Sequence, residues 1–185
     1  GAEATMFNHN FYLSRGVRNV NIRRNIITRA SSHGVSLNQS GTVEDNLIVR
    51  NAIGIFLRTA PATARGNVIL ESRDIAADVP RGFGIIIGSV YDHTPVLPPG
   101  PALVENNIIA NKTSVGTDQA ITFSSNMAPN NTSTTIRNNI IYNWKGASIE
   151  MNSSSTSVYD TCTISGNAIT ELAAKTYLVI TNESP

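Results

Sequence analysis

A six-residue pattern recurs along the chain and limits its possible folds more than any other feature. Each copy reads apolar-x-x-Asn-apolar-Ile, and the six copies carry their Asn at Asn25, Asn46, Asn67, Asn107, Asn139 and Asn167. The first two steps between these Asn residues are 21 residues each, and the later steps are 40, 32 and 28. A repeat of about 20 residues predicts a stacked array. The units are too short for helix pairs and rich in Ile, Val and Asn, so we expect strands that wind around a solenoid.

A short strand recurs between successive Asn motifs and often opens on Gly-Ile. Its copies span residues 34–37, 54–57, 84–87, 120–123 and 148–151, with outlying members at 11–13 and 177–180. Because side chains alternate between the two faces of a strand, every second residue is predicted to point inward. The predicted inward pairs are Val35/Leu37, Ile55/Leu57, Ile85/Ile87, Ile121/Phe123 and Ile149/Met151. Nearly full burial is expected for Ile55, Leu57, Ile85, Ile87, Ile121, Phe123, Ile108 and Ile140.

One coil of the array would contain this Gly-Ile strand and the two strands on either side of the Asn. The chain is therefore predicted to be all-β: a right-handed parallel β-helix with three strands per coil and about six to seven coils. It would form a single domain over residues 1–185. A fragment of a longer β-helix, with further coils before Gly1, is the alternative that the repeat leaves open.

The repeated Asn is placed at the bend between the second and third strands of a coil. Asn tolerates left-handed backbone conformations, and its amide can both donate and accept hydrogen bonds. We expect the amides of Asn46, Asn67, Asn107 and Asn139 to align and point inward, where they would satisfy turn carbonyls in a dry core. The alternative is that the Asn side chains face solvent at the turn and recur only because the repeat was duplicated.

These Asn-apolar-Ile and Gly-Ile repeats resemble those of the pectate-lyase-like superfamily of parallel β-helices, over nearly all of residues 11–180. The superfamily includes uronate lyases, glycosidases, sugar epimerases, phage tailspikes and adhesins, so the resemblance implies a fold and leaves the activity open. In the enzymes that it resembles, the polysaccharide lies along the face that corresponds to the Gly-Ile strands.

Composition favours a secreted protein that acts on an acidic polysaccharide. The chain has a formal charge of +1, with 41% hydrophobic and 15% charged residues, and no apolar run approaches the length of a membrane span. The densest basic cluster contains Arg15, Arg18, Arg23, Arg24 and Arg29. This cluster is either an exposed, solvated edge or a surface that attracts a polyanion. No aromatic platform is interleaved with it, so the polyanion that we expect is an acidic glycan and not nucleic acid. We expect an extracellular or periplasmic location without membrane insertion, and the oligomeric state stays open.

Insertions fall beside the Gly-Ile strands and never in the Asn turn. Asn46 to Ile55 takes 9 residues, whereas Asn67 to Ile85 takes 18. Loops carry function on a rigid scaffold, so the segments 70–83 and 88–103 are predicted to wall a groove. The groove would lie over the strand face near residues 56–58 and 84–88.

A uronate lyase or epimerase needs a cation or amide at the sugar carboxylate and a base for the C5 proton; a lyase also needs a group that assists departure at O4. The catalytic candidates are His33, Arg58, Tyr91 and His93. The candidates for substrate binding are Asn38, Phe56, Asp78, Arg81, Asp92 and Glu150. We therefore expect C5 proton abstraction by a lyase or an epimerase. A non-catalytic module that binds glycan or spaces other domains, as in tailspikes and adhesins, is the rival.

Other chemistries have less support in the sequence. A glycosidase needs paired carboxylates, and the outward positions of the Gly-Ile strands offer only Glu150. No cofactor is certain. Ca²⁺ stays open as a cofactor although no grouped Asp and Glu ligands are visible, so the metal ligands are unassigned.

Overall fold

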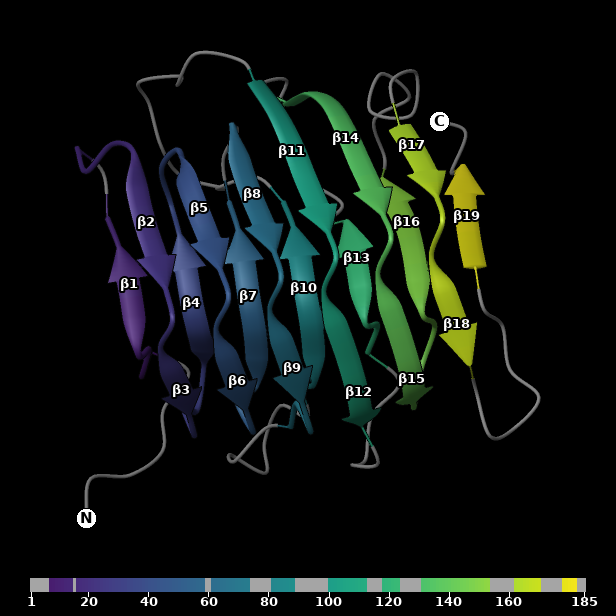
Figure 1. Ribbon diagram of the computed structural model, residues 1–185, viewed down its shortest axis with the longest axis horizontal. Helices are drawn as coiled ribbons and strands as arrows, with labels where there is room; N and C mark the ends of the chain where they lie inside the picture. The colour runs from purple at the N-terminus through teal and green to yellow at the C-terminus, as the bar shows by residue number, and fades with distance from the viewer. Residues whose placement is uncertain are drawn as a thin grey trace.

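Parallel pairing between successive coils organises the whole structure. The computed structural model describes residues 7–14, 16–58, 61–73, 81–88, 100–112, 118–123, 131–153, 162–170 and 178–182. Their strands form three parallel sheets of seven, six and six strands, named A, B and C. This is a parallel β-helix with three strands per coil, as predicted (Figure 1). The described residues include no helix that could span a membrane.

Each coil takes one strand from each sheet in the order A, B, C. Sheet A contains β1 (Phe11–Leu13), β4 (His33–Leu37), β7 (Ile53–Leu57), β10 (Phe83–Ile87), β13 (Ile121–Phe123), β16 (Ile149–Ser153) and β19 (Leu178–Asn182). Sheet B contains β2 (Val20–Arg23), β5 (Gly41–Glu44), β8 (Ala62–Arg65), β11 (Gly100–Glu105), β14 (Asn131–Arg137) and β17 (Cys162–Ser165). Sheet C contains β3 (Ile26–Thr28), β6 (Leu47–Val49), β9 (Val68–Leu70), β12 (Ile108–Lys112), β15 (Ile140–Trp144) and β18 (Ala168–Thr170).

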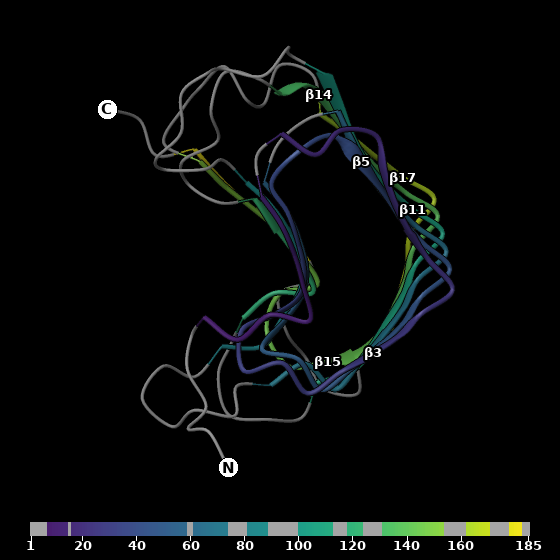
Figure 2. The same ribbon diagram turned by 90° about the vertical axis from the view of Figure 1, so that its left-hand side faces the viewer.

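Coil 1 comprises β1, β2 and β3, and each later coil takes the next three strands, up to β16, β17 and β18 in coil 6. Sheets B and C follow one another along one side of the molecule, opposite sheet A (Figure 2). The core lies between them. Its sheet A column of Val35, Ile55, Ile85, Ile121 and Ile149 is in register from coil to coil and fully buried, as predicted.

The prediction that Ile108 and Ile140 are buried is wrong. Their side chains are 40% and 48% exposed, whereas the next residue in each strand, Ile109 or Ile141, is completely buried. The side chain of the repeated Asn points into the core directly before each sheet C strand begins. Because side chains alternate along a strand, the residue after the Asn points outward and the Ile that follows it points inward.

These two neighbouring Ile residues form a matched test of the core. Ile109→Ala should lower the free energy of unfolding by about 2–4 kcal/mol, because it removes buried methyl groups and leaves a cavity. Ile108→Ala should change it by less than about 0.5 kcal/mol, because its side chain already meets solvent. Chemical denaturation of both variants measures the difference, and equal losses would contradict the assigned strand alternation.

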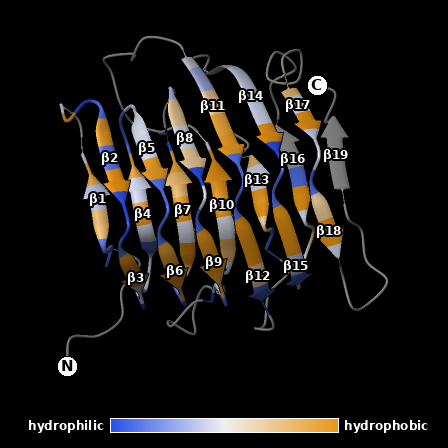
Figure 3. Cartoon of the chain, in the orientation of Figure 1, coloured by the Kyte–Doolittle hydropathy of each residue, from blue (hydrophilic) through white to orange (hydrophobic). Residues whose placement is uncertain are grey.

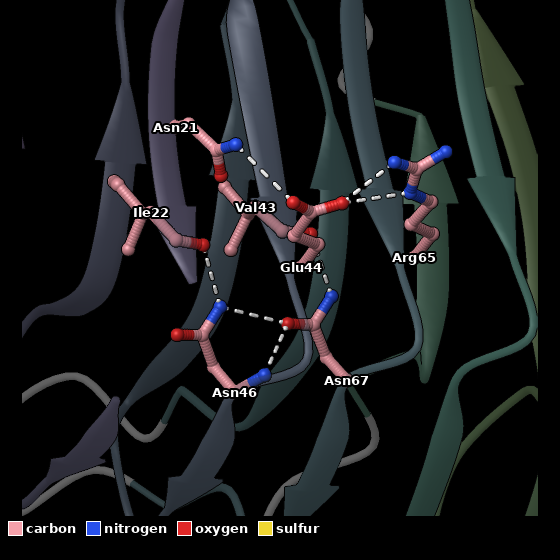
Figure 4. A network of polar contacts seen from close by, with 7 residues as sticks. All are labelled: Asn21, Ile22, Val43, Glu44, Asn46, Arg65 and Asn67. Atoms are coloured by element: carbon pink, nitrogen blue, oxygen red, sulfur yellow. Dashed lines mark hydrogen bonds and ion pairs between the residues drawn. The ribbon is translucent and has the colours of Figure 1, made fainter. Parts of the chain in front are cut away.

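The Asn residues form a continuous inward ladder, as predicted, and Figure 4 shows its members Asn46 and Asn67. Asn67 Nδ2 donates to Asn107 Oδ1 at 3.0 Å and to the Val43 carbonyl at 2.9 Å, and the Asn67 backbone N–H donates to the same Asn107 Oδ1 at 3.0 Å. The same three bonds recur at Asn46 and Asn139. Each buried amide therefore ties its own coil to both neighbouring coils.

The left-handed backbone at this turn belongs to the residue before the ladder Asn. The positive φ angles there are 57° at Arg24, 55° at Asp45, 63° at Gly66, 57° at Asn106, 55° at Asn138 and 64° at Gly166. The prediction explained the repeated Asn partly by tolerance of this conformation. The structure shows instead that its amide hydrogen bonds are what the Asn contributes.

A column of alternating charge runs along the last residues of the sheet B strands. In register from coil 1 to coil 5 it reads Arg23, Glu44, Arg65, Glu105 and Arg137. Arg65 Nη2 lies 2.7 Å from Glu44 Oε2, and Arg137 Nη2 lies 2.7 Å from Glu105 Oε2. The hydrogen bond from Arg65, with a second one from Asn21, lowers the pKa of the Glu44 carboxyl (Figure 4).

The Gly of the Gly-Ile motif reflects close approach between coils. A Cβ at Gly34 would lie 2.8 Å from the Gly54 carbonyl oxygen, and a Cβ at Gly54 would lie 2.6 Å from the Gly84 carbonyl oxygen. Backbone atoms cannot move aside as a flexible side chain can, so coils 2, 3 and 4 require Gly here, whereas coils 5 and 6 carry Ala120 and Ser148 at the equivalent position.

Candidate functional site

Sheet A has an outward column of side chains on the face where the sequence predicted the substrate. The register aligns Tyr12, Ser36, Phe56, Ile86, Thr122 and Glu150. Ser36, Ile86 and Thr122 are buried although they point away from the core. In coils 1 to 4, aromatic and basic side chains gather around this column, and they form the candidate site.

Two histidines from successive coils lie at the centre of the site. The rings of His9 and His33 stack with centroids 4.6 Å apart, and their Nδ1 atoms are 2.8 Å apart. His33 Nδ1 also lies 2.8 Å from Ser32 Oγ. On its other side the His33 ring stacks on Phe56 at 5.4 Å. These contacts fix the His33 ring, which is buried, whereas His9 is only partly buried.

Arg58 lies over the ring of Phe56. Its guanidinium carbon is 4.4 Å from the ring centroid, a cation–π geometry. Its Nε atom is buried and has no hydrogen-bond partner within the described parts of the chain. Burial lowers the pKa of Arg58, an effect that Tyr12 partly opposes. A partly buried guanidinium that lacks an acidic partner among these residues is suited to receive an anion.

Arg81 brings a second positive charge to the site from coil 4. Its Nη2 donates a hydrogen bond to the Ser31 carbonyl at 2.7 Å, 50 residues away in sequence. The charges of both Arg81 and Arg58 act on the two histidines. Of the sequence candidates, His33, Phe56, Arg58 and Arg81 therefore come together.

Both imidazoles are held in the neutral form. Burial is the main cause that lowers the pKa of His33 to about 3, and His9, Arg58 and Arg81 add to it. Burial and the same two arginines lower the pKa of His9. A neutral imidazole can accept a proton, but the low basicity of His33 makes it a weak base. Its contacts suit it to positioning His9.

This neutral histidine predicts acid-dependent stability. An unfolded His has a pKa of about 6.5, so below that pH the unfolded chain binds a proton that folded His33 does not. The contribution of His33 to the free energy of unfolding is therefore complete above about pH 6.5 and declines as the pH falls toward about 3. Between about pH 7 and pH 5 the loss from His33 should be about 2 kcal/mol. Urea unfolding across this range measures it. His33→Gln should flatten the slope, and an unchanged slope would contradict the assignment.

The remaining candidates are not all in the cluster. Asn38 is buried at the end of β4 and lies 3.4 Å from Ser36 Oγ. Glu150 lies three strands away from Phe56 in sheet A, about 14 Å at normal strand spacing, and accepts a hydrogen bond from Gln119. Asp78, Tyr91, Asp92 and His93 lie outside the described residues.

The predicted groove walls are only partly described. Residues 74–80 and 89–99 lie outside the described ranges, so half of the first wall and most of the second are untested. Within the second segment, residues 100–103 belong to strand β11 of sheet B and are not part of a wall. A strand that continues a sheet cannot also project beside sheet A, so this part of the prediction is wrong.

His9 and Tyr12 are site residues that the sequence reasoning missed. The signal was present in the repeat: His9 precedes Phe11 by two residues just as His33 precedes Val35, and Phe11 pairs with Val35. In the sequence, residues 11–13 match the strand repeat only as an outlying copy, and this match does not align their flanking residues with those of β4.

No group of three or more His, Cys, Asp or Glu side chains in the described segments could hold a metal ion. The expectation of Ca²⁺ therefore has no identified ligands in this part of the chain. No protein-family model matches the chain, and neither a curated protein nor a solved structure matches it. The functional proposal rests on the fold and on the geometry of the site.

Proposed function

We propose that this β-helix belongs to the pectate-lyase-like superfamily and acts on an acidic polysaccharide outside the cytoplasm, as a uronate lyase or epimerase. The observation that supports this most is Arg58, whose buried Nε has no partner among the described residues and whose guanidinium lies beside two neutral imidazoles. A uronate carboxylate would complete the hydrogen bonding of Arg58 and bring the sugar to the histidines.

Binding at Arg58 also activates the sugar. Removal of the C5 proton places negative charge on the uronate carboxylate, so a guanidinium that binds this group stabilises the transition state more than the ground state. Phe56 holds the guanidinium in place through the cation–π contact. Tyr12, 52% exposed on coil 1 and two coils away from Phe56, offers an aromatic surface and a hydroxyl to the sugar.

His9 is the group best placed to accept the proton. It is less buried than His33, and its ring lies 5.0 Å from that of Tyr12. In a lyase, the C5–H electrons form the C4–C5 double bond, the C4–O4 bond breaks, and O4 takes a proton from Tyr12 or water. In an epimerase, C4–O4 stays intact and a proton returns to C5 from the opposite face.

A non-catalytic glycan-binding module is the second candidate. The low basicity of both histidines favours it, because a weak base contributes less to proton abstraction. The described cluster also contains no carboxylate to act as a general acid or base. Binding alone needs only the arginines and the aromatic surface.

Incubation with pectate, alginate and hyaluronan separates these functions. A lyase raises the absorbance at about 235 nm, because elimination after proton abstraction creates a conjugated double bond. An epimerase leaves the absorbance unchanged and alters the C5 proton signals in NMR spectra. Binding by calorimetry without either change identifies a binding module. No reaction and no binding with any polymer would overturn the proposal.

A further inference from the structure

Side chains from four successive coils surround His9 in the candidate site. They are Tyr12 in β1, His33 in β4, Arg58 after β7 and Arg81 before β10. Two permanent cations therefore act on two bases, and none of the carboxylates in the described segments contributes to the pKa of either histidine. A bound anion would balance this group of charges.

The strands beneath these side chains keep the local polarity low. β7 and β10 consist only of hydrophobic residues and Gly (Figure 3). Charges at such a surface interact more strongly than charges in water. Burial lowers the pKa of His9, and the charges of Arg58 and Arg81 lower it further. In the unliganded site, the two arginines therefore oppose protonation of the histidine that is best placed to accept a proton.

We propose that a carboxylate bound at Arg58 raises the proton affinity of His9, so that the acidic sugar activates the base that removes its own C5 proton. The inference rests on the proposed function for the nature of this ligand, a uronate residue. The bound carboxylate would cancel the guanidinium charge that opposes protonation, and an anion close to an imidazole favours the imidazolium form. Arg58 can bind this carboxylate because its buried Nε has no partner among the described residues.

The contact between the two histidines limits the uptake to one proton. Their Nδ1 atoms are 2.8 Å apart, so in the neutral pair one Nδ1 carries a hydrogen and the other accepts it. One added proton converts His9 into an imidazolium that donates from its Nδ1 to His33 Nδ1. A second proton would set two N–H groups against each other at this distance. His33 is the more buried of the two, so the added proton belongs to His9.

This coupling offsets the low basicity of the unliganded histidines. With a uronate bound and the pH above the raised pKa, His9 is neutral and receives the C5 proton as a stronger base. At lower pH, His9 takes a proton from solvent when the uronate binds, and it can then no longer act as a base. An uncharged sugar leaves the arginine charges in force, so His9 stays a weak base. The site thus selects acidic sugars in the proton transfer as well as in binding.

Proton NMR titration of the histidine ring signals between about pH 4 and about pH 8 measures the proton affinity of His9 directly. The chain has three histidines, and the signal that is absent from His9→Gln identifies His9. Galacturonate is the carboxylate probe, and methyl galactoside is the matched sugar without a charge. Galacturonate should raise the pKa of His9, whereas methyl galactoside should leave it unchanged. An unchanged His9 titration in galacturonate would overturn the inference.

Calorimetry gives the reciprocal measurement. Because binding and protonation are linked, the affinity for galacturonate should rise as the pH falls through the titration of His9, by up to about tenfold per pH unit. No more than one proton should be taken up, and His9→Gln should lose most of this pH dependence. An affinity that does not change with pH would contradict the coupling.

Two arginine variants test whether the coupling passes through Arg58. Arg58→Gln should raise the pKa of His9 without a ligand, because one of the charges that lower it is gone, and galacturonate should then have little further effect. Arg137→Gln, on sheet B away from the site, should leave both titrations as in the unmodified chain. A galacturonate effect that survives in Arg58→Gln would overturn the assignment. The polymer assays decide the proposed function separately, since polymer binding with an unchanged His9 titration disproves only the coupling.

Discussion

Asn107→Ala should lower the free energy of unfolding by about 3–5 kcal/mol, because it removes three buried hydrogen bonds. The Asn67 backbone N–H and the Asn67 amide both lose their acceptor, Asn107 Oδ1, at 3.0 Å. The Ala64 carbonyl loses its donor, Asn107 Nδ2, also at 3.0 Å. Asn67 and Asn107 are completely buried, so water cannot replace these bonds without opening the turn. Urea denaturation of the purified variant measures the loss.

Asn25→Ala is the matched control at the open end of the ladder. Asn25 is partly buried, and its side chain only donates, to the Arg23 carbonyl and to Asn46 Oδ1. Its loss should cost less than about 1 kcal/mol, since solvent reaches the freed groups. If Asn107→Ala costs no more than Asn25→Ala, the ladder does not stabilise the interior as described.

Arg58→Ala should reduce turnover on the active uronate polymer by at least about 100-fold, with a smaller change in KM. The reason is that the guanidinium binds the carboxylate most strongly when proton removal has increased its charge. Arg58→Lys should recover only part of the rate, because an ammonium group cannot form the bidentate pair. Steady-state kinetics with the polymer identified by the absorbance or NMR assay measure both variants.

Arg137→Ala controls for the loss of an arginine elsewhere. Arg137 pairs with Glu105 on sheet B, away from the site, so its removal should leave turnover unchanged. In a binding module there is no turnover, and Arg58→Ala should instead raise the dissociation constant for the glycan. Unchanged rate and affinity in Arg58→Ala would show that the substrate binds elsewhere.

The fold was predictable because each coil repeats the same local constraints. A buried Asn needs the same partners in every coil, so its position is visible as a fixed six-residue spacing. The outward exposure of Ile108 was not predictable from that spacing alone. The buried Asn and the left-handed residue before it shift the strand alternation by one position, and this backbone detail is visible only in the structure.

The site was predictable only in part. Alternation in sheet A correctly placed Phe56 on the outer face, and the basic cluster around it includes Arg58 and Arg81. The partnership of His9 with His33 depends on the register between β1 and β4, which sequence spacing could suggest but not establish. The contact of Arg81 with Ser31 joins positions 50 residues apart, and no local pattern encodes such a distance.

The alternating charges of sheet B limit how this β-helix can change its length during evolution. Excision of coil 3 alone would preserve the Asn ladder and the core but bring Glu44 beside Glu105, two nearly buried carboxylates. Excision of coils 3 and 4 together would bring Glu44 beside Arg137 and restore the attraction. A gene for such a protein can therefore gain or lose coils most readily in pairs, so that the unit of duplication is twice the structural repeat.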